Sequence, residues 1–192
     1  MNYLRARNHI KTGDLLCCAG PWNFSRLIRL VTKSDISHVG LACWIQFNTG
    51  QKRLCMFEAV EGSDVRIVPL HHYLKTVFWP NSGKMWWQPL QNETINGSGL
   101  MDYCLQQWGQ GYVGSYQFIV GMLPLLQRIR KWIGKPMDID KNRFHCSELV
   151  TTALIQQGYQ HTKEPVFTTP GEVSKFGCWG SRVLLENNDE MD

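Results

Sequence analysis

The feature that most constrains the fold of this chain is a pair of strand-like segments joined by a tight turn. Residues 37–47 and 53–60 are rich in small and β-favouring side chains, and Asn48-Thr-Gly-Gln between them has the composition of a hairpin turn. An antiparallel hairpin centred there places residues opposite each other whose numbers sum to about 98 or 99. A slip of one residue would move every side chain to the other face, so this register decides what can meet across the hairpin.

The rest of the chain adds short strands and a few helices. Further strands are predicted at residues 15–19, 65–69 and 84–89, and helices at 23–32, 97–108 and 145–157, with another helix starting at Pro170. Strands followed by a helix, an irregular segment and a second helix favour the α+β class over alternating βαβ units. The length of 192 residues suits one domain, which we assign to residues 1–185. Residues 186–192 are expected to form an acidic, disordered tail.

Composition excludes several classes of protein. With 43% hydrophobic and 19% charged residues, the chain is neither disordered, collagen-like nor a coiled coil. It has 20 basic and 16 acidic residues, and four of the acidic ones lie in the last seven positions. This weak positive charge does not predict nucleic-acid binding, and its eight tryptophans are more readily explained as core residues. The charge is compatible with an anionic lipid headgroup.

The cysteines and the termini point to a reducing compartment. There are seven cysteines, an odd number, with no Cys-x-x-Cys pair and no zinc-like spacing. The N-terminus has no apolar core of a signal peptide, and no apolar run reaches the roughly 20 residues of a membrane span. We therefore expect a cytoplasmic protein without a metal or cofactor. The oligomeric state is left open.

Cys146 is the candidate nucleophile because it lies at the predicted start of a helix. The first turn of a helix has unpaired N–H groups and a partial positive charge, and both favour a thiolate over a thiol. The same N–H groups can stabilise an oxyanion. Taken alone, a free cysteine is more often a small core residue, and we interpret the other six in that way.

A catalytic cysteine needs a base, and His38 on the first strand of the hairpin is the candidate. Taken alone, a histidine on a predicted core strand is more often a satisfied core residue. The hairpin register places Glu58 opposite Gly40 or Leu41, as a diagonal neighbour that could orient the imidazole of His38. If the register slips, the fallback candidates for this third group are Glu61, Asp35 and His72.

These residues lie in short motifs whose order along the chain resembles a known family. The chain resembles the circularly permuted NlpC/P60 papain-like proteins, in particular the YiiX-like group, from about Thr12 to Phe176. The matching motifs are Thr12-Gly-Asp-Leu-Leu, Ser37-His-Val-Gly, Phe57-Glu-Ala, Val65-Arg-Ile-Val-Pro-Leu, Phe144-His-Cys-Ser-Glu-Leu-Val and Thr169-Pro-Gly-Glu. In this family the histidine strand precedes the cysteine helix, the reverse of the order in papain, and that is the order here.

The resemblance implies a small antiparallel sheet or barrel packed against the cysteine helix, with Cys146, His38 and Glu58 as a catalytic triad. Related proteins often place a tyrosine near the cysteine, and Tyr112 or Tyr116 could take that place. The implied chemistry is acyl transfer through a cysteine acyl-enzyme.

The substrate stays open between two classes. One is an amide bond in a small, peptidoglycan-like peptide. The other is an acyl-lipid, as in lecithin:retinol acyltransferase-like relatives. For the lipid, the apolar and basic residues 118–133 could contact a membrane surface, although a core helix is the simpler interpretation. A third alternative is a non-catalytic binding or structural protein that keeps the fold.

Overall fold

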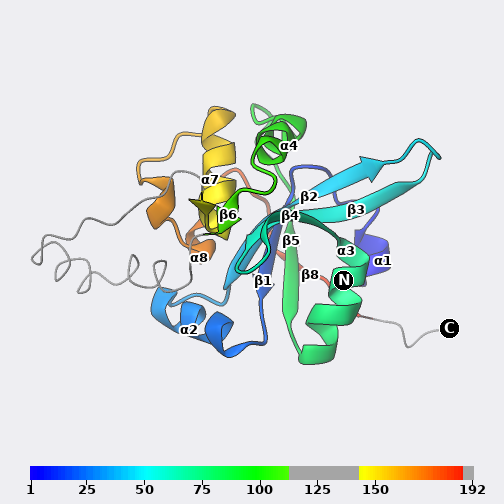
Figure 1. The fold of residues 1–192 in the computed structure, drawn as a ribbon, viewed down its shortest axis with the longest axis horizontal. Helices are drawn as coiled ribbons and strands as arrows, with labels where there is room; N and C mark the ends of the chain where they lie inside the picture. The colour runs from blue at the N-terminus through cyan, green and yellow to red at the C-terminus, as the bar shows by residue number, and fades with distance from the viewer. Residues whose placement is uncertain (113–142, 188–192) are drawn as a thin grey trace, which may run out of the picture.

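The computed structural model describes residues 1–112 and 143–187. A six-stranded sheet dominates it, with strand order β4-β3-β2-β1-β5-β8 and antiparallel pairing throughout (Figure 1). The short strands β6 and β7 form a separate parallel pair. The strands are β1 (Leu15–Ala19), β2 (His38–Gln46), β3 (Lys52–Val60), β4 (Asp64–Pro69), β5 (Lys84–Gln88), β6 (Gly111–Tyr112), β7 (Arg143–Phe144) and β8 (Val183–Leu184).

Helices lie on both faces of the sheet. They are α1 (Tyr3–Ala6), α2 (Asn23–Thr32), α3 (Leu70–Tyr73), α4 (Gly97–Gln106), α7 (Cys146–Gln156) and α8 (Pro170–Val173). A π-helical turn (Leu74–Phe78) and a 3₁₀ turn (Trp79–Asn81) continue α3, and a second 3₁₀ turn spans Pro165–Phe167. The α+β prediction is therefore confirmed as a mixed fold built on an antiparallel sheet.

Alternation along the strands divides the core between the two faces. On one face, Val39, Leu41 and Phe57 pack with Leu149 and Val150 of α7 and with residues of α4 and α8. The opposite face supports a second cluster beneath α1, α3 and the π-helical turn; its members include Tyr3, Leu16, Met56, Leu74 and Phe78. Alternate residues of β2 and β3 thus point into different layers, and the register decides which layer a polar side chain enters.

The hairpin adopts the first of the two predicted registers. Leu41 faces Phe57 and Ala42 faces Met56, so the numbers of opposed residues sum to 98. Continued by one pair, this register puts Gly40 opposite Glu58. Of the two predicted positions for Glu58, opposite Gly40 or opposite Leu41, the first is therefore confirmed. A Cβ atom on Gly40 would lie 2.5 Å from the Met56 methyl carbon and 2.6 Å from the Phe57 carbonyl oxygen. The Met56 side chain therefore occupies the room next to Gly40.

Two of the sequence motifs are structural. Asp14, in the Thr-Gly-Asp motif, is buried, and its carboxylate accepts hydrogen bonds from the backbone N–H groups of Lys11 and Leu90 and from the Trp87 indole. Thr169 begins α8, where it forms a reciprocal capping box with Glu172. These motifs connect segments that are distant in the sequence rather than supplying reactive groups.

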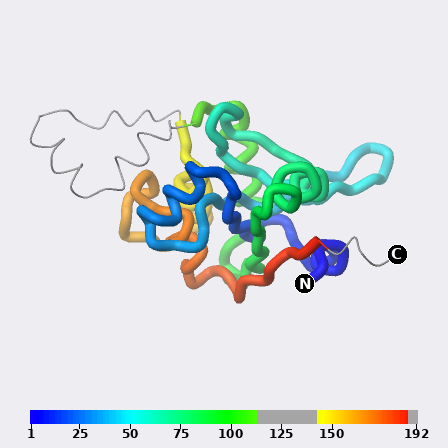
Figure 2. Tube along the Cα trace, turned by 90° about the horizontal axis from the view of Figure 1, so that it is seen from below, coloured from blue at the N-terminus to red at the C-terminus, as the bar shows by residue number. Residues whose placement is uncertain are grey.

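Both ends of the described chain pack together. Asn2 pairs with Glu186, and the N-terminal ammonium lies 2.9 Å from the Glu186 carboxylate. Figure 2 shows the first helix and the C-terminal segment side by side. Glu186, the first residue of the predicted acidic tail, thus takes part in the fold, while residues 188–192 lie outside the described residues. All seven cysteines are free thiols and buried.

Candidate active site

The candidate site lies where β2 begins and α7 begins. His38 is the first residue of β2 and Cys146 is the first residue of α7. The approach to His38 is fixed by Ser37, whose hydroxyl donates to the Cys18 carbonyl and accepts from the Gly20 N–H at 3.1 Å. A backbone bond from the Ser37 N–H to the same Cys18 carbonyl, 2.8 Å long, adds to this restraint. His38 is thereby held at the end of the sheet, next to the start of the helix.

Glu58 orients His38 from the neighbouring strand. The His38 Nε2 and Glu58 Oε2 atoms are 2.7 Å apart, and the Glu58 side chain is fully buried. Because a carboxylate can only accept, Nε2 carries the proton and Nδ1 is left to face another group. The predicted pairing of Glu58 with His38 is therefore present, whereas Asp35 bonds Arg182 and His72 is exposed at a different depression.

Arg66 on β4 completes the buried network and was not singled out from the sequence. Its Nε and Nη2 atoms donate to Glu58 Oε1 at 3.0 and 2.8 Å, and the two residues are directly opposed in the β3–β4 ladder. The two Glu58 oxygens thus serve different partners, one His38 and the other Arg66. Burial tends to raise the pKa of Glu58, but His38 and Arg66 together hold it below its ordinary value.

The His38 imidazole is biased towards its protonated form. Burial acts to lower the pKa of His38, but Cys146, through its charge and a side-chain hydrogen bond, and Glu58 together raise it to about 10. This is the electrostatic environment in which a histidine can keep a proton taken from a neighbouring thiol.

His145, next to Cys146 in the sequence, has a different role. Its Nδ1 accepts the Glu148 N–H at 3.2 Å and its Nε2 donates to the Val166 carbonyl at 2.7 Å, so the ring caps α7. Burial lowers the pKa of His145 to about 4, which keeps it neutral. His145 therefore fixes where the helix and Cys146 begin, while His38 is the histidine that interacts with the thiol.

Tyr112 approaches the site from the other side. The parallel pairing of β6 with β7 sets Tyr112 beside Phe144, two residues before Cys146. Burial, the charge of Cys146 and Glu61 all raise the pKa of Tyr112 well above its ordinary value. Of the two tyrosines suggested by the resemblance, Tyr112 is thus brought to the site. Tyr116 and residues 118–133 lie outside the described residues.

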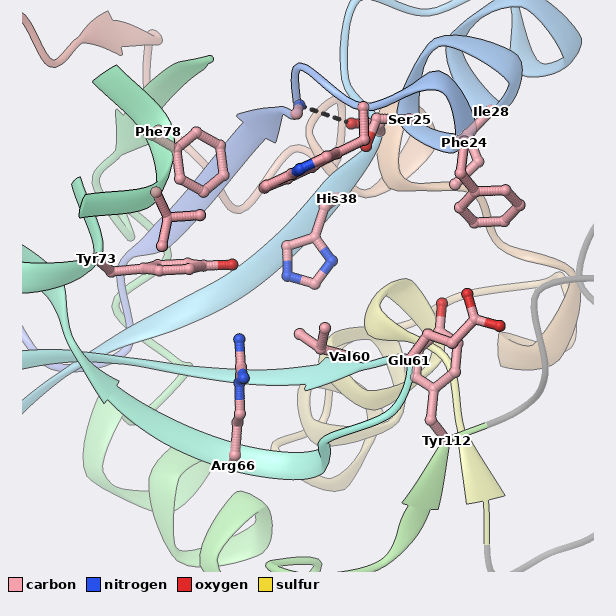
Figure 3. Close-up of a pocket in the computed structure, with 14 residues that line it drawn as sticks. Phe24, Ser25, Ile28, His38, Val60, Glu61, Arg66, Tyr73, Phe78 and Tyr112 are labelled. Atoms are coloured by element: carbon pink, nitrogen blue, oxygen red, sulfur yellow. Dashed lines mark hydrogen bonds between the residues drawn. The ribbon is translucent and has the colours of Figure 1, made fainter. Parts of the chain in front are cut away.

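A cavity of about 400 Å³ opens beside these groups (Figure 3). Its polar wall includes His38, Glu61, Arg66 and Tyr112, and Figure 3 shows the His38 ring pointing into the space between them. The remaining wall is mainly aromatic and aliphatic and comes from α2, α3 and the π-helical turn; it includes Trp22, Phe24, Ile28, Tyr73, Val77 and Phe78. Cys146 is 4% exposed and does not itself line the cavity, which it adjoins through His38.

Within residues 1–112 and 143–187, no three His, Cys, Asp or Glu side chains gather as metal ligands would. No helix in this part of the chain combines the length and the apolar character needed to cross a bilayer.

Comparison with known proteins places the fold but not the function. No protein-family model matches the chain, and no curated protein matches it in sequence. Among solved structures, it is similar to the metalloprotein YiiX from Escherichia coli O157:H7, of the family DUF1105, with a TM-score of 0.63. The two are 17% identical, and the match covers 93% of this chain and 99% of that one. The expected YiiX-like fold is therefore confirmed at the level of a distant structural likeness.

Proposed function

We propose that this protein is a cysteine hydrolase that forms an acyl-enzyme on Cys146, in a circularly permuted papain-like arrangement of the NlpC/P60 kind. The observation that carries the proposal is the continuous path from Cys146 through His38 and Glu58 to Arg66. Its support from the fold is the likeness to YiiX, together with a histidine strand that precedes the cysteine helix.

In the resting site we place the Cys146 proton on His38 Nδ1, as a thiolate–imidazolium pair, because the raised pKa of His38 keeps its ring protonated at neutral pH. The thiolate attacks the substrate carbonyl carbon, and the negative oxygen that results is stabilised by the N–H of Cys146 in the first turn of α7. When this intermediate collapses, the bond to the leaving amine or alcohol breaks, and the leaving group takes the proton from His38. A water molecule then gives a proton to His38 and attacks the thioester, and the collapse of this second intermediate releases the carboxylic acid and restores the thiolate–imidazolium pair.

Each of the supporting residues has one role in this reaction. Glu58 keeps the His38 proton on Nε2 and stabilises the imidazolium. Arg66 keeps Glu58 ionised, because its bidentate contact compensates for the burial of the carboxylate. Tyr112, which lines the cavity together with His38, is our candidate for a second donor to the oxyanion.

The cavity favours an acyl-lipid over a small peptide as substrate. Much of its wall is aromatic or aliphatic, which suits an acyl chain better than a polar peptide backbone. An amide bond in a peptidoglycan-like peptide remains the second candidate, since the same chemistry cleaves it. A non-catalytic role would not explain why Glu58 holds the His38 ring in one orientation.

YiiX is described as a metalloprotein, but the side chains of this site do not fit a metal ion. Both oxygens of Glu58 are used by His38 and Arg66, and His38 uses Nε2 for Glu58. Within residues 1–112 and 143–187, no further His, Cys, Asp or Glu joins them to complete a ligand set.

The first experiment measures the rate at which iodoacetamide alkylates Cys146 as a function of pH, with the modified residue located by mass spectrometry. Wild type, His38→Ala and the matched control His72→Ala are compared, since His72 is exposed and lies away from the site. We expect fast labelling below pH 7 that is lost in His38→Ala and unchanged in His72→Ala. A labelling midpoint at about pH 8.5 that is the same in wild type and in His38→Ala would contradict the proposal.

Substrate class is tested next with p-nitrophenyl esters of increasing chain length and with small peptide amides. Activity that rises with chain length and disappears in Cys146→Ala supports the lipid. Cleavage of the amides alone supports the peptide, and biological activity retained in full by Cys146→Ala would indicate a non-catalytic protein.

A further inference from the structure

Helix α2 exposes large apolar side chains in adjacent turns. Leu27 and Leu30 are 42% and 75% exposed, and because they are three residues apart they are neighbours on the helix surface. Trp22, at the N-cap of the same helix, is 47% exposed. Single exposed apolar residues are common on proteins, but Leu27 and Leu30 share one surface of α2, and Trp22 adds a third exposed apolar side chain at the start of the helix.

The charges around this patch are positive. Arg26 and Arg29 lie on α2 and Lys33 follows it, whereas no acidic residue occurs between Gly20 and Ser34. Arg29 makes long hydrogen bonds, 3.4 and 3.5 Å, to the carbonyls of Ser25 and Gly20. Arg26 and Lys33 are exposed. An apolar helix face bordered by basic side chains is the pattern of a helix that lies in the interface of an anionic membrane.

The same helix forms part of the cavity wall. Its inward-facing residues Phe24 and Ile28 line the cavity, and Figure 3 shows them on the α2 side of His38. Trp22 joins the two surfaces, since it is exposed, lines the cavity and packs edge-on against Phe78 with ring centroids 6.0 Å apart. A ligand entering past Trp22 would therefore pass directly from the α2 surface to His38.

We propose that α2 is an interfacial helix that docks on an anionic lipid bilayer and turns the cavity towards it. Leu27, Leu30 and Trp22 would insert between the lipids, and Arg26 and Lys33 would contact phosphate groups. Docking by itself needs no catalysis. That the docked lipid supplies the acyl chain to the cavity rests on the proposed function.

The test is co-sedimentation of the full chain with vesicles of phosphatidylcholine alone and of phosphatidylcholine mixed with phosphatidylglycerol. The variants are Leu27→Ser/Leu30→Ser and Arg26→Gln/Lys33→Gln. Leu105→Ser is the matched control, because Leu105 is 46% exposed on a different helix, α4. Circular dichroism melts establish that each variant is folded.

We expect binding to the anionic vesicles that weakens as salt is added. The double leucine variant should bind at least tenfold more weakly, the double charge variant should lose most of its salt dependence, and Leu105→Ser should bind like wild type. Equal binding by wild type and the leucine variant would overturn the proposal. So would vesicle binding that depends instead on Arg128, Arg130 and Lys131. Gel filtration that finds a dimer in wild type and a monomer in the leucine variant, with vesicle binding unchanged, would overturn it as well.

Failure of the docking surface and failure of the hydrolase are separable. Alkylation of Cys146 is measured without vesicles, and sedimentation can be repeated with Cys146→Ala. Docking that persists in Cys146→Ala supports the surface independently of the chemistry. If alkylation of Cys146 depends on His38 but the protein does not sediment with vesicles, the docking surface alone is overturned.

Discussion

Replacing Arg66 with methionine isolates the part of the buried network that lies furthest from the thiol. Methionine keeps much of the apolar stem of arginine but removes both hydrogen bonds to Glu58 Oε1, at 3.0 and 2.8 Å. Glu58 would then be a fully buried carboxylate with His38 as its sole charged partner in the described network. We expect the pKa of Glu58 to rise, because burial is no longer offset by the guanidinium.

The loss of stability expected for Arg66→Met follows from the hydrogen bonds that the substitution removes. Hydrogen bonds to charged groups contribute about 1.5–3 kcal/mol each, and removal of one partner from a buried pair costs about 3–5 kcal/mol. Because the Arg66 side chain is partly exposed, we take the lower end, about 3 kcal/mol. For a chain of this length that lowers the melting temperature by about 6–12 °C.

The assay is thermal unfolding at neutral pH, together with the iodoacetamide profile of Cys146. Arg66→Lys should lie between wild type and Arg66→Met, since lysine keeps the charge but cannot bind in a bidentate way. The matched control is Arg53→Met, an arginine on β3 that lies over the Phe47 ring and has no carboxylate partner in the described residues. If Arg66→Met melts at the same temperature as Arg53→Met, the argument that Arg66 sustains Glu58 is wrong.

Three further outcomes are expected. Folding raises the pKa of His38 from its ordinary 6.5 to about 10. The contribution of the His38 charge to stability is therefore complete below pH 6.5 and is lost as the pH rises towards 10. Urea titrations of wild type should show this loss of stability, and titrations of His38→Gln should not. Gly40→Ala should lower the free energy of unfolding by about 1–3 kcal/mol, because the new Cβ would meet the backbone oxygen of Phe57, whereas Gly177→Ala, with open space around it, should be close to neutral in the same titration. Tyr112→Phe should reduce kcat on the best ester about 100-fold with little change in melting temperature, if its hydroxyl stabilises the oxyanion; unchanged kcat would remove Tyr112 from the mechanism.

The part of the site that could be predicted from the sequence depends on local structure. A hairpin with a short turn has a nearly fixed register, so the position of Glu58 relative to His38 follows from counting residues across it. Cys146 could be placed at a helix start because an apolar stripe from Leu149 to Gln157, closed by Gly158, predicts a helix over residues 145–157. In both cases the deciding contacts lie within about twenty residues of one another, where propensity and periodicity carry information.

The parts that could not be predicted depend on contacts between distant segments. Arg66 reaches Glu58 because a second hairpin turn continues the sheet, and a strand arginine gives no signal of which carboxylate it will meet. Tyr112 is positioned by a two-residue parallel pair with residues 143–144, far too short to leave a pattern. The N-terminal segment reads as a polar lead-in, yet Tyr3, Ala6 and Ile10 are buried against the sheet. Spacing within so short a helix cannot distinguish a buried face from an exposed one.

The buried network also indicates why these polar residues are present. A buried ion pair seldom stabilises a protein more than apolar residues of the same volume would, because the desolvation of both charges offsets their attraction. The face of the sheet that holds Glu58 is otherwise apolar, with Met56 and Leu54 on the same strand. Stability alone therefore gives no reason to bury a carboxylate between His38 and Arg66. A requirement on the orientation and charge of the His38 ring does give one, and that ring interacts with the cysteine at the start of α7.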